Sequence, residues 1–206
     1  MDLTHVLRED SDGPRPGAAI SLTIRDATVE DAPACAAIYA PFVRDTWVSF
    51  ESEPPDADEM AHRIETYQQR HAWLVAELDG RVVGYAYATP YAARAAYRWS
   101  VETSVYLAPD ARGQGAGRRL YEALFTRLRR RGYRRIVTGV ALPNDASVRL
   151  HESLGFRQVG TFERIGWKLG GWRDVTRFQL DLVEEDTVPD GGAAGPGGPV
   201  TPAEPS

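Results

Sequence analysis

The spacing of apolar residues divides the middle of the chain into alternating strands and helices. Helical spacing predicts a helix from Thr28 toward Phe42, a second at 57–70, and a third at 144–154. Another helical face begins near residue 116, with apolar side chains at Leu120, Tyr121, Leu124 and Leu128. Short apolar runs predict strands at 22–25, 73–78, 81–89, 101–107, 135–140, 158–163 and 172–182. This order predicts the α/β class, with one mixed sheet carrying helices on its faces.

Turn and cap residues mark the ends of several of these elements. Thr28 with Asp31 three positions later is a helix-start pattern. Asp79-Gly80 between two apolar runs predicts a tight hairpin turn, because both residues tolerate positive φ. Gly155 directly after the 144–154 helix is the expected C-terminal cap.

Composition separates one domain from two tails. Residues 1–20 and 185–206 are rich in Gly and Pro without apolar periodicity, so both are expected to be disordered. Residues 21–184 are long enough for a single well-buried domain. No apolar run is long enough for a membrane span, and no secretory signal is evident. The single cysteine, Cys35, excludes an intrachain disulfide, so we expect a buried structural thiol and a cytoplasmic protein.

Charge gives no general reason to expect nucleic acid, because the net charge is −5. A basic cluster nevertheless ends the helix that carries Leu128. It consists of Arg127, Arg129, Arg130, Arg131, Arg134 and Arg135. We interpret it as a solvated helix end whose cations suit the helix dipole. The alternatives are a nucleic-acid patch or a contact to a ligand phosphate.

The Gly-rich turn Arg112–Gly117 follows a strand and opens a helix, which directs consecutive backbone N–H groups toward an anion. Arg118 and Arg119 follow it where a nucleotide-triphosphate loop needs Lys and Ser or Thr. The next strand ends in Gly139-Val140-Ala141, without the acidic residue of a dinucleotide fold. A diphosphate-binding turn of another type remains, beside the alternative of a Gly-rich turn without a ligand.

Two side chains have the chemistry of a proton donor and a proton acceptor. His151 lies two helical turns after Asn144 on the same helix face, and a histidine exchanges protons near neutral pH. Glu102 lies at the start of the strand before the Gly-rich turn, where a carboxylate can take a proton from an ammonium group. The plainer alternatives are a helix-capping Asn144, a histidine without a role and an exposed strand-end Glu102.

The turn Arg112–Gly117 and the segment Asn144–Phe156 resemble the two acetyl-CoA motifs of the GNAT N-acetyltransferases. Trp99–Tyr106 and Ser147–Glu152 are further similar to the phosphinothricin and methionine sulfoximine acetyltransferases within that family. The resemblance covers about residues 22–183. It implies the GNAT fold, with a mixed, largely antiparallel sheet and helices on both faces, acetyl-CoA as co-substrate, no metal, and a homodimer.

The resemblance also implies roles for individual residues. Glu102 and His151 become the catalytic base and acid, with His151 where most of the family has tyrosine. The acceptor would contact Phe50, Arg94, Tyr97, Glu102 and Thr103. The residues expected to bind acetyl-CoA are Val105, Tyr106, Leu107, Arg112, Gly113, Gln114, Gly115, Ala116, Gly117, Arg118, Asn144, Ser147 and Ser153.

Several of these assignments have plainer alternatives. Arg94 is otherwise a solvated loop cation, and Phe50 and Tyr97 are otherwise core aromatics. Lys168, the only lysine of the chain, and Trp172 border either the site or a dimer contact. The chain departs from the herbicide-resistance members of the family at Ala92 and at Leu169-Gly170-Gly171.

The expected activity is acetyl-CoA-dependent N-acetylation of a small amino acid-like amine, such as phosphinothricin or methionine sulfone or sulfoximine. The resemblance implies direct transfer in a ternary complex. One alternative is acetylation of a protein N-terminus or a polyamine, and Arg94 favours an anionic acceptor instead. Another is a non-catalytic acetyl-CoA-sensing module, which would need neither Glu102 nor His151.

Overall fold

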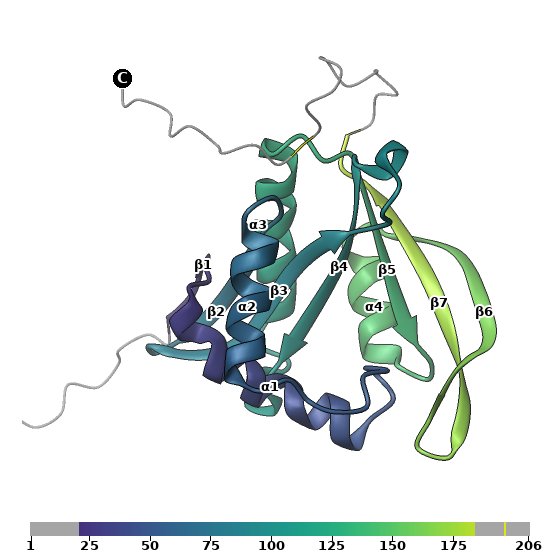
Figure 1. Cartoon of the computed structure of the whole chain (residues 1–206), viewed down its shortest axis with the longest axis horizontal. Coiled ribbons are helices and arrows are strands. Elements are labelled where there is room, and N and C mark those ends of the chain that lie inside the picture. The colour runs from purple at the N-terminus through teal and green to yellow at the C-terminus, as the bar shows by residue number, and fades with distance from the viewer. Residues whose placement is uncertain (1–20, 184–195, 197–206) are drawn as a thin grey trace, which may run out of the picture.

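A computed structural model describes residues 21–183 and Pro196, and within them it places seven strands in one sheet of order β1-β2-β3-β4-β5-β7-β6 (Figure 1). The predicted tails, 1–20 and 185–206, lie outside the described residues apart from Pro196. The strands are β1 (Leu22–Asp26), β2 (Trp73–Leu78), β3 (Arg81–Pro90), β4 (Ser100–Leu107), β5 (Arg135–Ala141), β6 (Arg157–Lys168) and β7 (Gly171–Asp181). The helices are α1 (Ala32–Asp45), α2 (Ala57–Gln68), α3 (Ala116–Arg130) and α4 (Asp145–Ser153), with 3₁₀ turns at Val29–Asp31, Ala95–Tyr97 and Pro109–Ala111.

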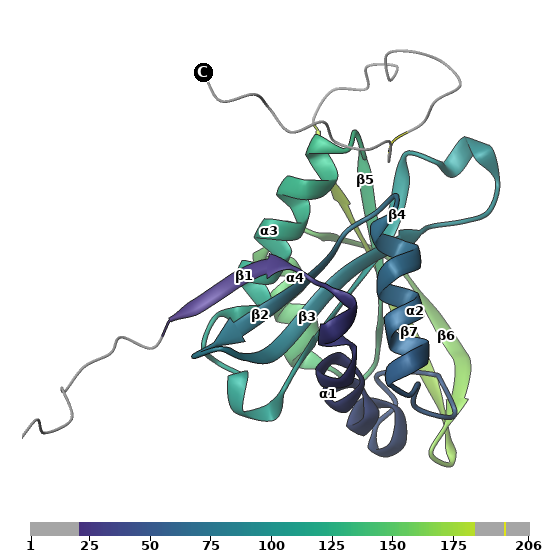
Figure 2. The same ribbon diagram turned by 60° about the vertical axis from the view of Figure 1, so that its left-hand side comes forward.

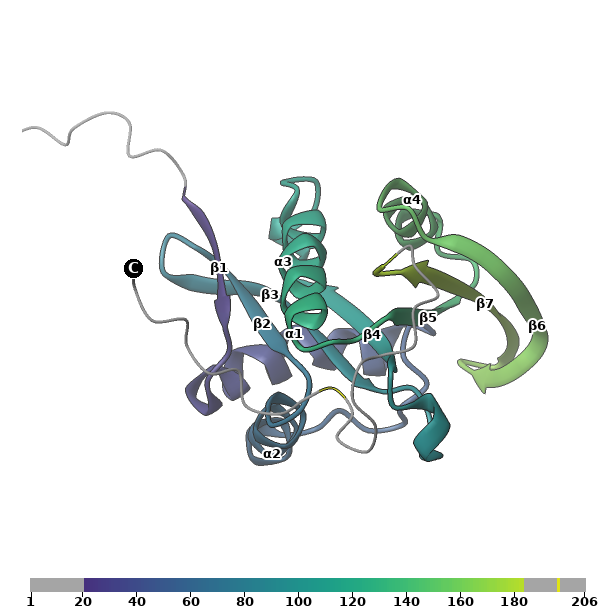
Figure 3. The same ribbon diagram turned by 90° about the horizontal axis from the view of Figure 1, so that it is seen from above.

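Helices cover both faces of the sheet, which confirms the predicted fold class (Figure 2, Figure 3). On one face α3 packs Leu120, Leu124 and Leu128 against β2, β3 and β4, and α4 lies beside it. On the other face α1 and α2 pack on Trp73 and Tyr85. Both clusters are apolar and fully buried, so burial of apolar surface is the main source of stability on each side.

One strand pair distinguishes this sheet, because β4 and β5 are parallel while the other neighbours are antiparallel. Their pairing covers only three positions, from Ser100 with Arg135 to Glu102 with Val137. Beyond Glu102 the two strands diverge toward their C-terminal ends (Figure 1). The sheet is therefore open between the ends of β4 and β5.

The predicted turns are confirmed. Asp79 and Gly80 have φ of 50° and 78°, and Gly155 has φ of 89° after α4. The last two strands form a longer hairpin than predicted, since β6 starts at Arg157 and continues to Lys168. His71 has no neighbouring sequence pattern that would indicate burial, yet it is buried against the Tyr133 ring. Burial, together with nearby arginines, lowers the pKa of His71 to about 4, so its imidazole is neutral at neutral pH.

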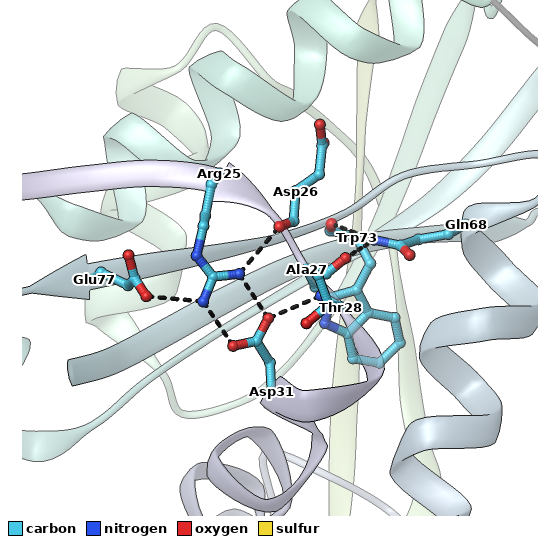
Figure 4. A network of polar contacts seen from close by, with 8 residues as sticks. All are labelled: Arg25, Asp26, Ala27, Thr28, Asp31, Gln68, Trp73 and Glu77. Atoms are coloured by element: carbon cyan, nitrogen blue, oxygen red, sulfur yellow. Dashed lines mark hydrogen bonds and ion pairs between the residues drawn. The ribbon is translucent and has the colours of Figure 1, made fainter. Parts of the chain in front are cut away.

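A polar network joins the first strand to the start of α1 (Figure 4). The Arg25 guanidinium donates to both oxygens of Asp31 at 2.7 Å and to Glu77 at 2.8 Å. The Asp31 carboxylate also accepts from the Thr28 N–H at 2.8 Å, which is half of the predicted helix-start pattern. Gln68 of α2 donates to the Ala27 carbonyl at 2.7 Å beside it. The Arg25–Asp31 pair thus connects β1 to the start of α1, and Arg25 also connects β1 to β2 through Glu77.

The basic cluster at the end of α3 is only partly solvated. Arg127 pairs with Asp26 at 2.7 Å, and Arg129 donates to the Leu182 carbonyl at 3.0 Å. Arg131 donates to the backbone carbonyls of Gln68 and His71. These arginines attach the helix end to neighbouring segments. The cluster also lies at the opposite end of α3 from the Gly-rich turn, which argues against the alternative of a ligand-phosphate contact.

We expect Asp31→Asn to lower the free energy of unfolding by about 2 kcal/mol at pH 7. The substitution removes the negative charge that pairs with Arg25 in a largely buried position. Burial alone would raise the pKa of Asp31, but its hydrogen bonds to Arg25 and Thr28 outweigh burial and lower that pKa. The ionised form is therefore stabilising above the unfolded pKa, roughly 3.9, and the contribution is lost as the pH falls through the folded pKa.

Urea denaturation of wild type and Asp31→Asn at pH 7 and at pH 3 measures this difference. The gap between the two proteins should narrow at the lower pH. The exposed Asp58→Asn serves as the control and should change stability by less than about 0.5 kcal/mol. Equal stability of Asp31→Asn and wild type at pH 7 would contradict the role of the network.

Candidate functional site

The opening between β4 and β5 contains a cleft of about 50 Å³. Along β4 the side chains alternate, so Ser104 and Tyr106 face α1 and α2 while Val105 faces α3. Residues of both faces line the cleft, which therefore passes through the sheet. They are Val48, Ser104, Val105, Tyr106, Tyr121, Thr138, Gly139, Val140, Ala141, Asn144, Ser147 and His151.

The backbone of β4 presents polar groups to this opening. Ser100 and Ala108 hydrogen-bond with β3, so by alternation the N–H and C=O of Thr103, Val105 and Leu107 face the diverging β5. The Thr138 hydroxyl donates to the Thr103 carbonyl at 3.0 Å, just where the ladder ends. Beyond it the Val105 N–H faces the cleft. This geometry favours Val105 over Tyr106 as the predicted backbone donor, because the Tyr106 amide faces β3.

The Gly-rich turn has the open backbone that an anion requires. Gly113 and Gly115 have φ of 78° and 77°, and a Cβ added to either would meet no atom within 4 Å. Gly115 is the N-cap of α3, whose first backbone N–H groups have no intrahelical partner. Gly117 is needed for packing instead, since an added Cβ would lie 3.4 Å from Leu107 and Leu150. The turn therefore has room for an anionic group such as a diphosphate.

Four polar side chains predicted to bind acetyl-CoA have partners within the protein. Gln114 donates to the Asp110 carbonyl at 2.8 Å, and the Arg112 guanidinium lies 5.7 Å from the centre of the Phe42 ring. Arg118 donates to the carbonyl and hydroxyl of Ser153 at 2.9 and 2.8 Å, which ties α3 to α4. Their contacts to a ligand remain predictions.

Asn144 is the N-cap of α4, as the plainer alternative expected. Its side-chain oxygen accepts from the Ser147 N–H at 3.2 Å. Both residues also line the cleft, so capping and ligand binding are compatible. The cap places the first turn of α4 at the side of the opening that faces α3.

His151 is 2% exposed and lies between α3 and α4. Its Nδ1 is 2.7 Å from the Ser147 carbonyl, which only accepts, so Nδ1 carries the proton. Its Nε2 is therefore the acceptor of the Tyr121 hydroxyl, 3.0 Å away. Burial lowers the pKa of His151, and the bond to Ser147 offsets this only in part. The imidazole is therefore neutral at neutral pH, and the proton shared with Tyr121 belongs to the phenol.

Glu102 lies on the other face of the sheet, at the last position of β4 that pairs with β5. Its carboxylate accepts from Arg177 of β7 at 2.8 Å, and its side chain is about one-third exposed. Thr89 of β3 is paired with Glu102 and points to the same side. The two predicted catalytic side chains thus approach the opening from opposite faces.

A groove of about 440 Å³ continues from Thr89 along α2. Within it the Arg63 guanidinium pairs with Glu51 at 2.9 Å and with Glu59 at 2.8 Å. The lining residues are Glu51, Glu59, His62, Arg63, Thr66, Tyr67, Tyr87 and Thr89. Because Glu102 is paired with Thr89, the groove borders the side of the opening on which Glu102 lies.

Of the predicted acceptor residues, Phe50 is the best placed beside this groove. It precedes Glu51 and is 43% exposed, so it is not a core aromatic. Lys168 donates to the carbonyls of Ser49 and Glu51 at 2.5 and 2.8 Å, and this clamp fixes the Phe50 segment to β6. The Phe50 ring lies so close to Gly166 that no side chain fits there.

The other predicted acceptor residues lie farther from the α2 groove in the fold than Phe50 or face another side of the sheet. Arg94 and Tyr97 are exposed on the loop between β3 and β4, whose ends flank the Thr89–Glu102 pair. The Tyr97 ring contacts Tyr91 with 5.5 Å between centres, so it is not a core aromatic. Thr103 is 2% exposed on the opposite face, toward α3. We therefore correct its assignment, because its side chain does not reach the acceptor side.

Three site residues were not found from the sequence. Tyr121 has the helical apolar spacing of a core position. Only the hydrogen bond between its hydroxyl and His151 reveals a polar role. Thr138 and Arg177 lie inside strand patterns. Arg177 is separated from Glu102 by 75 positions in the chain, so no local signal links the two.

The described residues contain neither a metal-binding group nor a membrane-spanning helix. No group of three or more His, Cys, Asp or Glu side chains in residues 21–183 is arranged to hold a metal ion. Among the helices of that same range, none is both long and apolar enough to cross a membrane.

Comparison with known proteins gives a consistent result. The acetyltransferase (GNAT) family model matches residues 39–156. The chain is 42% identical over 159 residues to a phosphinothricin N-acetyltransferase of Streptomyces viridochromogenes, covering 77% of this chain and 87% of the relative. It is 36% identical to an L-methionine sulfoximine/L-methionine sulfone acetyltransferase of Salmonella typhimurium, covering 82% and 99%.

The fold has close matches among solved structures. One is a GNAT superfamily phosphinothricin acetyltransferase from Sinorhizobium meliloti in complex with acetyl-CoA. It is 36% identical, covers 84% of this chain and 95% of that one, and has a TM-score of 0.79.

We expect Gly115→Ala to weaken acetyl-CoA binding about 10-fold or more, because a methyl group would stand over the N–H groups that open α3. Gly80→Ala is a matched control, since Gly80 has the same φ within 1° and equally open surroundings in the β2–β3 turn. Titration calorimetry with acetyl-CoA measures both affinities. Thermal unfolding shows whether backbone strain lowers the Tm of the two variants equally. Equal affinities of the two variants would contradict the assignment of the turn.

Proposed function

The chain belongs to the GNAT acetyltransferase family, and we propose that it transfers the acetyl group of acetyl-CoA to the amine of a small amino acid-like acceptor. The observation that carries this proposal is a cleft that passes through the sheet. The Gly-rich turn and His151 lie on one side of it, and Glu102 and the α2 groove lie on the other. Donor and acceptor can therefore meet in the opening without crossing the protein.

On the donor side, the backbone N–H groups after Gly113 bind the diphosphate, and Asn144 and Ser147 border the path of the donor toward the opening. Acetyl-CoA, when bound, supplies an acetyl group activated as a thioester. The Val105 N–H points into the opening, where it can hydrogen-bond the carbonyl oxygen of that group. These groups are fixed by β4 and α4, so little reorganisation is needed.

On the acceptor side, Glu102 takes the proton that an ammonium group must lose before its nitrogen can attack. Phe50 covers the groove, and Arg94 and Tyr97 offer a cation and a hydroxyl to an anionic end group. Arginine suits a carboxylate or phosphinate because its planar fork matches paired oxygens. Phosphinothricin and methionine sulfoximine or sulfone have this combination of amine and anionic end.

Tyr121 and His151 together act on the leaving sulfur. Burial raises the pKa of Tyr121 to about 12, well above the usual thiol value near 8.5. The phenol is thus too weak an acid for complete proton transfer to a thiolate. We propose that it stabilises the developing negative charge by hydrogen bonding, and that neutral His151 holds the hydroxyl in place.

The rival activities are less well supported by the geometry. A polyamine needs free carboxylates, whereas Arg63 pairs with both Glu51 and Glu59 in the groove. A sensing module needs no base at the opening, whereas Glu102 lies at its edge. A protein N-terminus lacks the anionic end group that Arg94 would contact.

We further propose a homodimer formed through the β6–β7 hairpin. β6 is the edge of the sheet, and its side chains are unusually exposed for apolar residues. This hairpin surface consists of Val159, Phe162, Ile165, Trp167, Leu169 and Trp172, which are 46–60% exposed. A second copy of the chain would bury it, and Lys168 and Gly166 connect the surface to the Phe50 segment.

The decisive experiment for the activity is thiol release from acetyl-CoA. Its acceptor panel contains amino acids, phosphinothricin, methionine sulfoximine, methionine sulfone, spermidine and an N-terminal alanine peptide. We expect the anionic amino acid analogues to be the best acceptors, since the site offers a base and an arginine. A preference for spermidine or the peptide would favour the corresponding rival, and no release with any amine would refute the enzyme.

For the catalytic groups, we expect Glu102→Gln to lower kcat by about 100-fold or more, because the amide cannot take a proton. Tyr121→Phe and His151→Ala should each lower kcat by about 10- to 100-fold. The first variant removes the hydroxyl that donates to the leaving sulfur, and the second removes the imidazole that holds this hydroxyl in place. Calorimetry should show that all three variants still bind acetyl-CoA. Full turnover in any one variant would remove the role given to that residue.

For the dimer, we expect Ile165→Glu to shift the protein from dimer to monomer, because it places a charge within the buried apolar surface. Sedimentation velocity across a concentration series measures the mass. Glu65→Lys, on the exposed side of α2, is the control and should stay dimeric. A monomeric wild type at all concentrations would refute the proposed interface.

A further inference from the structure

Arg177 is the polar neighbour of Glu102, although the two residues come from strands that are not adjacent. Arg177 lies on β7, Glu102 lies on β4, and β5 runs between them. The guanidinium Nη1 nevertheless reaches the Glu102 Oε1 at 2.8 Å. Its side chain must therefore cross the surface of β5 on the acceptor face.

Gly139 provides the path for this crossing. It is paired directly with Arg177 in the β5–β7 ladder. A Cβ added to Gly139 would lie 2.8 Å from the Arg177 Nη1 and 3.3 Å from a methyl of Val175. Residue 139 is glycine because any side chain there would occupy the space through which the Arg177 side chain reaches Glu102.

The pairing leaves the Glu102 carboxylate with one engaged and one available oxygen. Oε1 accepts from Arg177, and among residues 21–183 no hydrogen bond to Oε2 is found. The pair is only partly solvent-covered, with side chains 24% and 36% exposed, so solvent screens it only in part.

We infer that Arg177, reaching over Gly139, is a positioning residue that orients the Glu102 carboxylate so that Oε2 faces the acceptor amine. The inference rests on the proposed function, because Glu102 is the base only if the chain acetylates an amine. Arg177 acts through Glu102 and does not itself exchange the proton. The proton moves from the acceptor ammonium to Oε2, and the nitrogen lone pair then attacks the thioester carbonyl carbon. The C–S bond breaks, the sulfur leaves as a thiolate, and the second proton lost by the nitrogen converts the thiolate to a thiol.

The geometry also defines the competing role. The other N–H groups of Arg177 could bind an anionic acceptor directly, which would make it a specificity residue. The two roles differ in the measured constants. Orientation of the base affects kcat and depends on Glu102, whereas direct binding affects the acceptor KM and persists without Glu102.

The test compares Arg177→Met, Arg177→Lys and Gly139→Ala in the full chain, each with and without Glu102→Gln. Gly139→Ala is informative because it keeps both charged residues and displaces the flexible end of the guanidinium. Gly139 also lines the cleft, so the acetyl-CoA KM of this variant shows whether donor binding is affected as well. Arg157→Met is the matched control, an exposed arginine on the same hairpin. Thiol release gives kcat and both KM values, and thermal unfolding gives Tm.

We expect Arg177→Met and Gly139→Ala to lower kcat by about 10- to 100-fold, the usual effect of a catalytic group displaced by about 1 Å. The acceptor KM should change by less than about 3-fold, and Arg177→Lys should recover part of kcat. In the Glu102→Gln background none of these changes should lower kcat further, because residues that act as a unit are not additive.

Three results would overturn the inference. The first is full kcat in Arg177→Met, and the second is a raised acceptor KM that persists in the Glu102→Gln background. The third is a fall in kcat matched by an equal fall in the folded fraction, with no recovery in Arg177→Lys. A wild-type protein that acetylates no amine would instead refute the proposed function, and with it the catalytic role of the pair.

Discussion

The short parallel contact between β4 and β5 is the constraint on which the rest of the site depends. Three paired positions hold the strands together, and after Glu102 they separate while each stays paired on its other side with an antiparallel partner. A sheet normally shields one face from the other. Here the gap exposes backbone amides in its middle and lets side chains of both faces approach one point.

Each face uses that opening differently. The α3–α4 face supplies backbone groups, through the Gly-rich turn and the capped start of α4. The α1–α2 face supplies charged side chains, with Glu102, Arg177 and the Arg63 cluster. Anion binding by a helix N-terminus requires no buried cation, so the donor face can remain apolar where it contacts the core. The Glu102–Arg177 pair and the Arg63 cluster then lie on the face where a polar acceptor arrives.

Local patterns were sufficient for much of this arrangement. Gly115 and Gly155 could be predicted because positive φ leaves a strong signature in one residue. Asn144 could be predicted as a cap, since its partner Ser147 is three positions away. Tyr121 could not be recognised, because a phenol on an apolar helix face has the same spacing as a core residue. Arg177 and Gly139 could not be linked to Glu102 either, since their relation exists only through the order of strands in the sheet.

His71 shows the same limit, because the Tyr133 ring that buries it is 62 positions away in the chain.

The clamp formed by Lys168 has a chemical consequence. Lys168 carries the only side-chain amine in the chain, and its ammonium is engaged by two backbone carbonyls. Acylation of that nitrogen would remove its charge and disrupt those donations, releasing the Phe50 segment from the hairpin. An amine-reactive label therefore addresses a single side chain here, and its slow incorporation would report how often the segment detaches.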